Sequence, residues 1–287
     1  MSKALQIATY IITWTSFPIA ITSCILRCYY CTYLKRSWRA DDFMSVVVGV
    51  SLVGALGLWQ RVMLLNCAGP EPNICNYSDP SGDALTWLFI MLIYYAILHF
   101  IVRSAFFTFY LQFSNQSNLR FWIGMGFGLN IMLLIIDVLL IVFQCKPIAA
   151  TFEPLQRLTA QCMDQEFGLY APAVLNAALN LYVLVLPLST LWSIQTPTRR
   201  KMYICCVLTT GTAAVALGFI RLHALSILST NTNTSAGVGE MMIMAALGMS
   251  LAAITHNLPS MRIFWRHVSR PRSNERDTSY RPCNVGS

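Results

Sequence analysis

Apolar residues in this sequence gather in seven long blocks that are separated by short polar segments. Blocks of about twenty residues match the thickness of a bilayer's hydrocarbon core, because an α-helix rises about 1.5 Å per residue. Water cannot satisfy backbone polar groups at that depth, so each block is expected to be a helix. The pattern predicts an all-α membrane protein, a bundle of seven transmembrane helices over residues 6–32, 43–65, 84–112, 121–143, 167–193, 202–228 and 239–264.

The composition supports this class of protein. The chain has 287 residues, of which 56% are hydrophobic and 11% are charged. Soluble domains carry about 25% charged residues, so an ordinary soluble protein is excluded. The first block is too long for the apolar region of a signal peptide and lacks a small-residue cleavage site. We expect one membrane domain over residues 1–267 and a basic, disordered cytosolic tail over residues 268–287.

Basic residues are concentrated in alternate loops, which predicts the orientation. On the side of the membrane that carries the N-terminus, the basic residues are Lys3, Lys146 and Arg157. By the positive-inside rule, the N-terminus is outside or lumenal and the C-terminus is cytosolic. The net charge of +8 therefore reflects topology and attraction to membrane lipid, and we expect no nucleic-acid partner. The cytosolic basic residues are Lys35, Arg36, Arg39, Arg120, Arg199, Arg200, Lys201, Arg262, Arg266, Arg270, Arg272, Arg276 and Arg281.

Cysteines and glycosylation sequons agree with this orientation. Disulfides persist in an oxidising compartment, and four cysteines fall in the predicted outer loops. They allow three pairings, which the sequence leaves open. Asn76 and Asn233 begin outer-face sequons and are candidate glycosylation sites. The candidate disulfide cysteines are Cys67, Cys75, Cys145 and Cys162.

Ionisable residues at membrane depth are costly, so they are candidate functional residues. Asp137 is the only carboxylate well inside a predicted span, and Arg221 and Arg61 lie at a compatible depth to pair with it. We expect an outward-opening polar cavity walled by predicted helices 2, 4, 5, 6 and 7. The alternatives are an ion pair between helices that binds no ligand, and an Arg61 or Arg27 that extends to the headgroups. The candidate ligand-binding residues are Asp137, Asn176, Asn180, Arg221 and His223.

Recognisable catalytic chemistry is harder to find. No nucleophile elbow, nucleotide-binding motif or metal-ligand spacing occurs, so we expect no cofactor and no metal. None of the four lysines lies inside a span, which excludes a retinal Schiff base on a helical lysine. Acid–base chemistry by Asp137 with Arg221 or His223 remains an alternative for an intramembrane cyclase or isomerase. The sequence leaves enzymatic activity uncertain and favours a protein without it.

An ordered set of residues runs through most of the chain at spacings shared with a known family. The set is Arg27, Asp41, Asp42, Arg103, Tyr110, Cys145, Pro147, Cys162, Asp164, Asn176, Asn180, Pro187, Trp192, Gln195, Pro197, Lys201, Gly211, Arg221, Leu258, Pro259 and Arg262. With these residues the chain resembles the fungal rhodopsin-domain family of seven-helix integral membrane proteins, many of which accompany secondary-metabolite gene clusters. It departs from the family at Asn180, where an aspartate is usual, and at Gln112, where an arginine is usual.

The resemblance implies a role around a specialised metabolite. We expect an accessory membrane component of a fungal secondary-metabolite biosynthetic pathway that binds a small metabolite or precursor. A receptor-like sensor of an extracellular compound, with basic inner loops docking a cytosolic transducer, is the alternative, followed by the intramembrane enzyme. A transporter is disfavoured because the sequence has no visible internal repeat. Either the plasma membrane or an endomembrane fits the sequence.

Overall fold

The computed structural model describes residues 2–65, 83–113, 117–151, 161–163, 165–193, 212–213, 216, 218–220 and 234–268. The predicted all-α membrane fold is confirmed. The long helices are α1 (Ser2–Tyr29), α2 (Ala40–Leu64), α3 (Asp83–Phe113), α4 (Ser117–Val142), α6 (Gln165–Ser193) and α8 (Thr234–Val268). The short elements are a π-helical turn (Tyr30–Lys35), β1 (Cys145–Lys146), a 3-10 turn (Ile148–Thr151) and β2 (Gln161–Cys162).

Within the described ranges, five helical stretches are long and apolar enough to cross a membrane, and α6 contributes a shorter apolar stretch. The five are Ile7–Leu34, Ala40–Leu64, Leu85–Gln112, Ser117–Val142 and Glu240–Leu258, and the shorter one is Tyr170–Leu186. The predicted block at 202–228 falls mostly outside the described residues, and its few described positions are helical. The basic tail after residue 268 also lies outside them.

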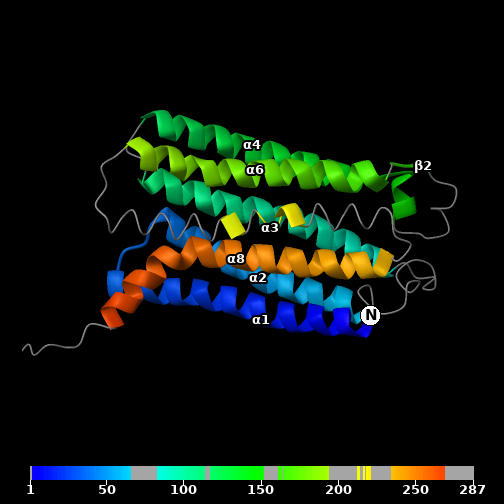
Figure 1. The fold of residues 1–287 in the computed structure, drawn as a ribbon, viewed down its shortest axis with the longest axis horizontal. Coiled ribbons are helices and arrows are strands. Elements are labelled where there is room, and N and C mark those ends of the chain that lie inside the picture. The colour runs from blue at the N-terminus through cyan, green and yellow to red at the C-terminus, as the bar shows by residue number, and fades with distance from the viewer. Residues whose placement is uncertain are drawn as a thin grey trace, which may run out of the picture.

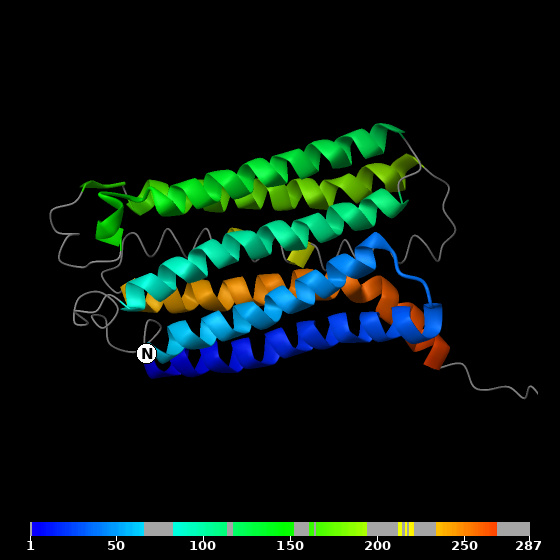
Figure 2. The same cartoon turned by 180° about the vertical axis from the view of Figure 1, so that it is seen from behind.

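The helices run side by side, with α3 between two groups (Figures 1 and 2). Helices α1, α2 and α8 lie on one side of α3, and α4 and α6 lie on the other. The N-terminus and β2 lie at one end of the bundle, and the C-terminal end of α8 lies at the opposite end (Figure 1). This arrangement is compatible with the predicted orientation, which stays a prediction.

Two clusters of buried apolar side chains fill the bundle, and α3 contributes to both. The larger one joins α1, α2, α3 and α8, and Phe17, Leu52, Trp59 and Leu98 are among its fully buried members. The smaller one joins α3, α4 and α6 around Phe107. Since α3 has apolar partners on both sides, it connects the two groups of described helices.

Helix α4 carries three glycines, and one of them lies where the neighbouring helices approach closely. A Cβ on Gly126 would lie 2.7 Å from Cε1 of Tyr182 and 2.8 Å from Cε1 of Phe107, on the neighbouring α6 and α3. A Cβ on Gly124 or Gly128 would have no described atom within 4 Å. The three glycines alternate along α4, so only the middle one faces the neighbouring helices.

Candidate functional site

Arg103 on α3 carries a charge that is buried in the bundle, with its residue 4% exposed. Its Nε donates to Oδ1 of Asn180 at 2.8 Å, and its Nη2 donates to Oδ1 of Asn176 at 2.6 Å. The same Nη2 lies 3.3 Å from the backbone carbonyl of Asn176 and 3.4 Å from Nδ1 of His99. The guanidinium is thus surrounded by neutral acceptors from α3 and α6.

Asn176 connects this guanidinium to the carboxylate of Asp137 on α4. Its Nδ2 donates to Oδ2 of Asp137 at 2.9 Å and to the carbonyl of Pro172 at 2.8 Å. The amide therefore accepts from Arg103 on its oxygen and donates to Asp137 on its nitrogen, the one orientation that serves both charges. We call Arg103, His99, Asn176, Asn180 and Asp137 the central cluster.

Helical spacing explains why these side chains meet. Asn176 and Asn180 are four residues apart on α6, and His99 and Arg103 are four residues apart on α3. Residues at that spacing lie one above the other on the same helix face. Polar side chains that hydrogen-bond across helices are typical of interfaces inside membranes. The central cluster is therefore built from one face of α3 and one face of α6, with Asp137 added from α4.

The structure brings together three of the predicted ligand-binding residues, Asp137, Asn176 and Asn180. Arg221 and His223 lie outside the described residues, so their pairing with Asp137 stays a prediction. The pairing of Asp137 with Arg61 is wrong. Arg61 is exposed near the end of α2, with its guanidinium carbon 6.0 Å from the ring centroid of Trp87. That position suits a cation–π contact at the edge of the bilayer.

A second polar cluster surrounds Arg27, which lies near the C-terminal end of α1. Its Nη2 pairs with Asp41, and its Nε and Nη2 lie 3.1 and 3.0 Å from Oδ1 of Asp42. Its Nη1 donates to the carbonyl of His256 on α8 at 3.0 Å. Gln112 at the end of α3 donates to Oδ1 of Asp41 at 2.6 Å. We call these five residues the Arg27 cluster, and it joins α1, α2, α3 and α8.

The expectation that Arg27 reaches the headgroups is wrong, because its side chain is 2% exposed. Two carboxylates at the start of α2 compensate its charge, which makes burial tolerable. Asp42 also stabilises that helix end, since its Oδ2 accepts from the backbone N–H of Arg39 at 3.0 Å. The sequence analysis named Asp41 and Asp42 only in the set shared with a known family and missed their ion pair with Arg27. Arg27 and the two aspartates occur together in the set of residues shared with the family, and this could have indicated that they pair.

Residues around Asn257 continue the Arg27 cluster along α8. The amide of Asn257 accepts from Ser45 Oγ at 2.8 Å and donates to Ser23 Oγ at 3.0 Å and Cys24 Sγ at 3.1 Å. Pro259 follows closely, and a proline cannot donate a hydrogen bond to the preceding turn. Helix α8 bends in its C-terminal part (Figure 1). The polar contacts therefore hold α8 against α1 and α2 next to the bend.

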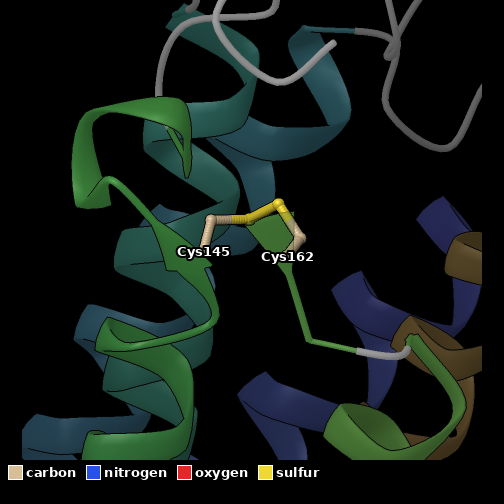
Figure 3. The surroundings of a disulfide bond; sticks show 2 residues. All are labelled: Cys145 and Cys162. Atoms are coloured by element: carbon tan, nitrogen blue, oxygen red, sulfur yellow. A yellow bond between two sulfur atoms is a disulfide. The ribbon is translucent and has the colours of Figure 1, made fainter. Parts of the chain in front are cut away.

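The disulfide joins Cys145 to Cys162 and selects one of the open pairings (Figure 3). These residues face each other in the antiparallel pair of β1 and β2, and Met163 N–H donates to the carbonyl of Gln144 at 2.8 Å. The bridge connects the segment after α4 with the segment before α6 (Figure 3). The other candidate cysteines, Cys67 and Cys75, and both glycosylation candidates, Asn76 and Asn233, lie outside the described residues.

A bundle of long apolar helices with ionisable groups buried between them defines a multi-pass integral membrane protein. Residues 26–267 match the fungal rhodopsin domain. Because this match covers most of the sequence, the chain belongs to the fungal rhodopsin domain family. No curated protein and no solved structure matches the chain significantly. Among the described residues, no group of three or more His, Cys, Asp or Glu side chains could hold a metal ion.

Proposed function

We propose that the protein binds a small metabolite or precursor as an accessory membrane component of a fungal secondary-metabolite pathway. The observation that supports this is the charge of Arg103, which lies among neutral acceptors and is connected to Asp137 through the amide of Asn176. Burying a charge inside a membrane without a direct counter-ion is costly, and such residues usually mark functional sites. Asp137, Asn176 and Asn180 bind the polar groups of this ligand together with Arg103, and Arg221 and His223 complete the site.

Lipid is the second partner in this proposal. Exposed apolar side chains on α4 include Ile131, Met132, Ile135 and Leu139. They suit contact with acyl chains, because water would disfavour so much apolar surface on a monomeric protein. The protein is thereby held in the plasma membrane or an endomembrane, where an apolar metabolite is concentrated.

Deletion of the protein in its native host tests the proposal. The metabolite profile of the deletion strain is compared with strains complemented by the wild type, Arg103→Gln, Asp137→Asn or the control Arg61→Gln. We expect the wild type and Arg61→Gln to restore the parent profile and the other two to fail, at equal protein levels in membranes. Restoration by Arg103→Gln and Asp137→Asn would contradict a role for the central cluster. Accumulation of one unprocessed intermediate, with ligand affinity retained in Asp137→Asn, would favour a cyclase or isomerase.

A receptor-like sensor is the second candidate function, and one observation favours it. Helix α3 carries both Arg103 and Gln112, which contact the central cluster and the Arg27 cluster. Their separation of nine positions corresponds to about 14 Å along the helix. A ligand that shifts α3 would thereby act on contacts at the cytosolic end, where the basic loops would dock a transducer. In this case deletion would leave the set of compounds unchanged and abolish the response to added metabolite.

A further inference from the structure

We infer that the ligand of the central cluster carries a carboxylate, which accepts hydrogen bonds from Nη1 of Arg103. This inference rests on the proposed function and adds the chemical class of the ligand. Three observations support it. Nη1 of Arg103 has no acceptor among the described residues, and no described carboxylate lies next to Arg103. A second buried donor without an acceptor lies on the neighbouring helix α2.

The donors of Arg103 are used unevenly. A guanidinium presents five N–H donors in a rigid plane. In Arg103, Nε and Nη2 form the edge that contacts Asn180, Asn176 and His99. Within the described part of the chain, Nη1 has no acceptor at hydrogen-bonding distance. A carboxylate oxygen suits this remaining charged donor better than a neutral acceptor does, because charge-assisted hydrogen bonds are stronger.

The two buried arginines differ in their counter-ions. Arg27 has carboxylate oxygens of two aspartates within 4.0 Å, and its three nitrogens all contact an acceptor. Arg103 has no carboxylate within that distance among the described residues. The amide of Asn176 lies between Arg103 and Asp137 and forms a hydrogen bond with each. A ligand carboxylate would give Arg103 the direct counter-ion that Arg27 already has.

A second donor without an acceptor lies close to the same face of α3. The ring of His99 meets Tyr95 edge to face at 4.5 Å, and Tyr95 lies 6.2 Å from the ring of Trp59 on α2. Trp59 is 1% exposed, and its Nε1 has no partner among the described residues. A buried indole N–H normally finds an acceptor. The acceptor for this indole would be a separate oxygen of the ligand, because the rings of His99 and Tyr95 lie between Arg103 and Trp59.

The test uses the full chain in lipid nanodiscs and a small-molecule extract of the native host in two forms. One portion is untreated, and the carboxyl groups of the other are converted to methyl esters. Bound compounds are eluted and identified by mass spectrometry, and thermal stabilisation of the protein is measured in parallel. The variants are Arg103→Gln and Arg103→Lys, with Arg61→Gln as the control for loss of an arginine outside the cluster.

We expect the untreated extract to stabilise the wild type and to yield a bound acid, and the esterified extract to lose both effects. Affinity for the identified acid should fall about 10–100-fold in Arg103→Gln, the usual effect of losing a charged hydrogen bond. Equal binding from both extracts would overturn the carboxylate and leave metabolite binding standing. Binding from neither extract would overturn the proposed function itself. The comparison of extracts uses the wild type alone, so it holds even if a variant fails to fold.

Discussion

Helix α4 approaches its neighbours closely at Gly126, which gives a sharp test of the packing. In Gly126→Ala the new methyl group would lie 2.7–2.9 Å from ring atoms of Tyr182 and Phe107. Two carbon atoms in favourable contact are about 3.5 Å apart, so the rings would have to retreat by about 0.6–0.8 Å. Phe107 is fully buried, and the hydroxyl of Tyr182 donates to the backbone carbonyl of Trp122 at 2.7 Å. Neither ring can move without disturbing other contacts.

Gly124→Ala is the matched control, since its methyl group would have no described atom within 4 Å. Alanine replaces glycine on the same helix in both variants, so the gain in helix propensity cancels in the comparison. Overpacking a well-packed core costs about 1–3 kcal/mol. We expect the free energy of unfolding of Gly126→Ala to be lower than that of Gly124→Ala by about this amount.

Reversible unfolding of the purified protein in mixed micelles, followed by far-UV circular dichroism, measures this difference. The larger variant Gly126→Leu should lower stability further, whereas Gly124→Leu should remain close to the wild type. If the two alanine variants unfold within about 0.5 kcal/mol of each other, the expected overpacking cost is absent. The close contact between α4 and the rings of Tyr182 and Phe107 would then be wrong.

Three further predictions concern other contacts. Arg27→Gln leaves two buried carboxylates without their cation and should lower the free energy of unfolding by about 3–5 kcal/mol, measured in micelles against Arg61→Gln. Cys145→Ser removes the disulfide of a loop with a sequence separation of 17 and should cost about 2–4 kcal/mol, with the reduced wild type as the comparison; equal stability of oxidised and reduced protein would contradict this. Gly54→Ala would place a methyl group on the hydroxyl of Tyr94 and should lower the melting temperature, whereas Gly57→Ala should not.

Hydropathy predicts where helices begin and end and how deep each residue lies, because the bilayer imposes a fixed thickness. It says little about which way a side chain points around the helix axis, since lipid-facing and core-facing positions are both apolar. The burial of Arg27 against two aspartates was therefore missed. For Asp137 the sequence predicted Arg221 or Arg61 as the cation, whereas the structure shows Arg61 exposed beside Trp87.

The rotation of each helix about its own axis also explains the remaining differences between the sequence predictions and the structure. Asn176 and Asn180 could be expected to act together, because their spacing of four places them on one face wherever that face points. Their partner Arg103 could not be selected over other basic residues, since the choice depends on how α3 and α6 are rotated against each other. The same limit applies to the three glycines of α4, which look alike in the sequence and differ only in what they face.

The disulfide has a mechanical consequence for the helices that it joins. Cys145 lies three residues after the end of α4, and Cys162 lies three residues before the start of α6. Sliding of one helix past the other is therefore restrained at this end, and the hydrogen bond between Asp137 and Asn176 keeps its register. We therefore expect α4 and α6 to move together as a rigid pair relative to α3 in any rearrangement that admits a ligand. The displacement between the two helices should be smallest at the end with the disulfide.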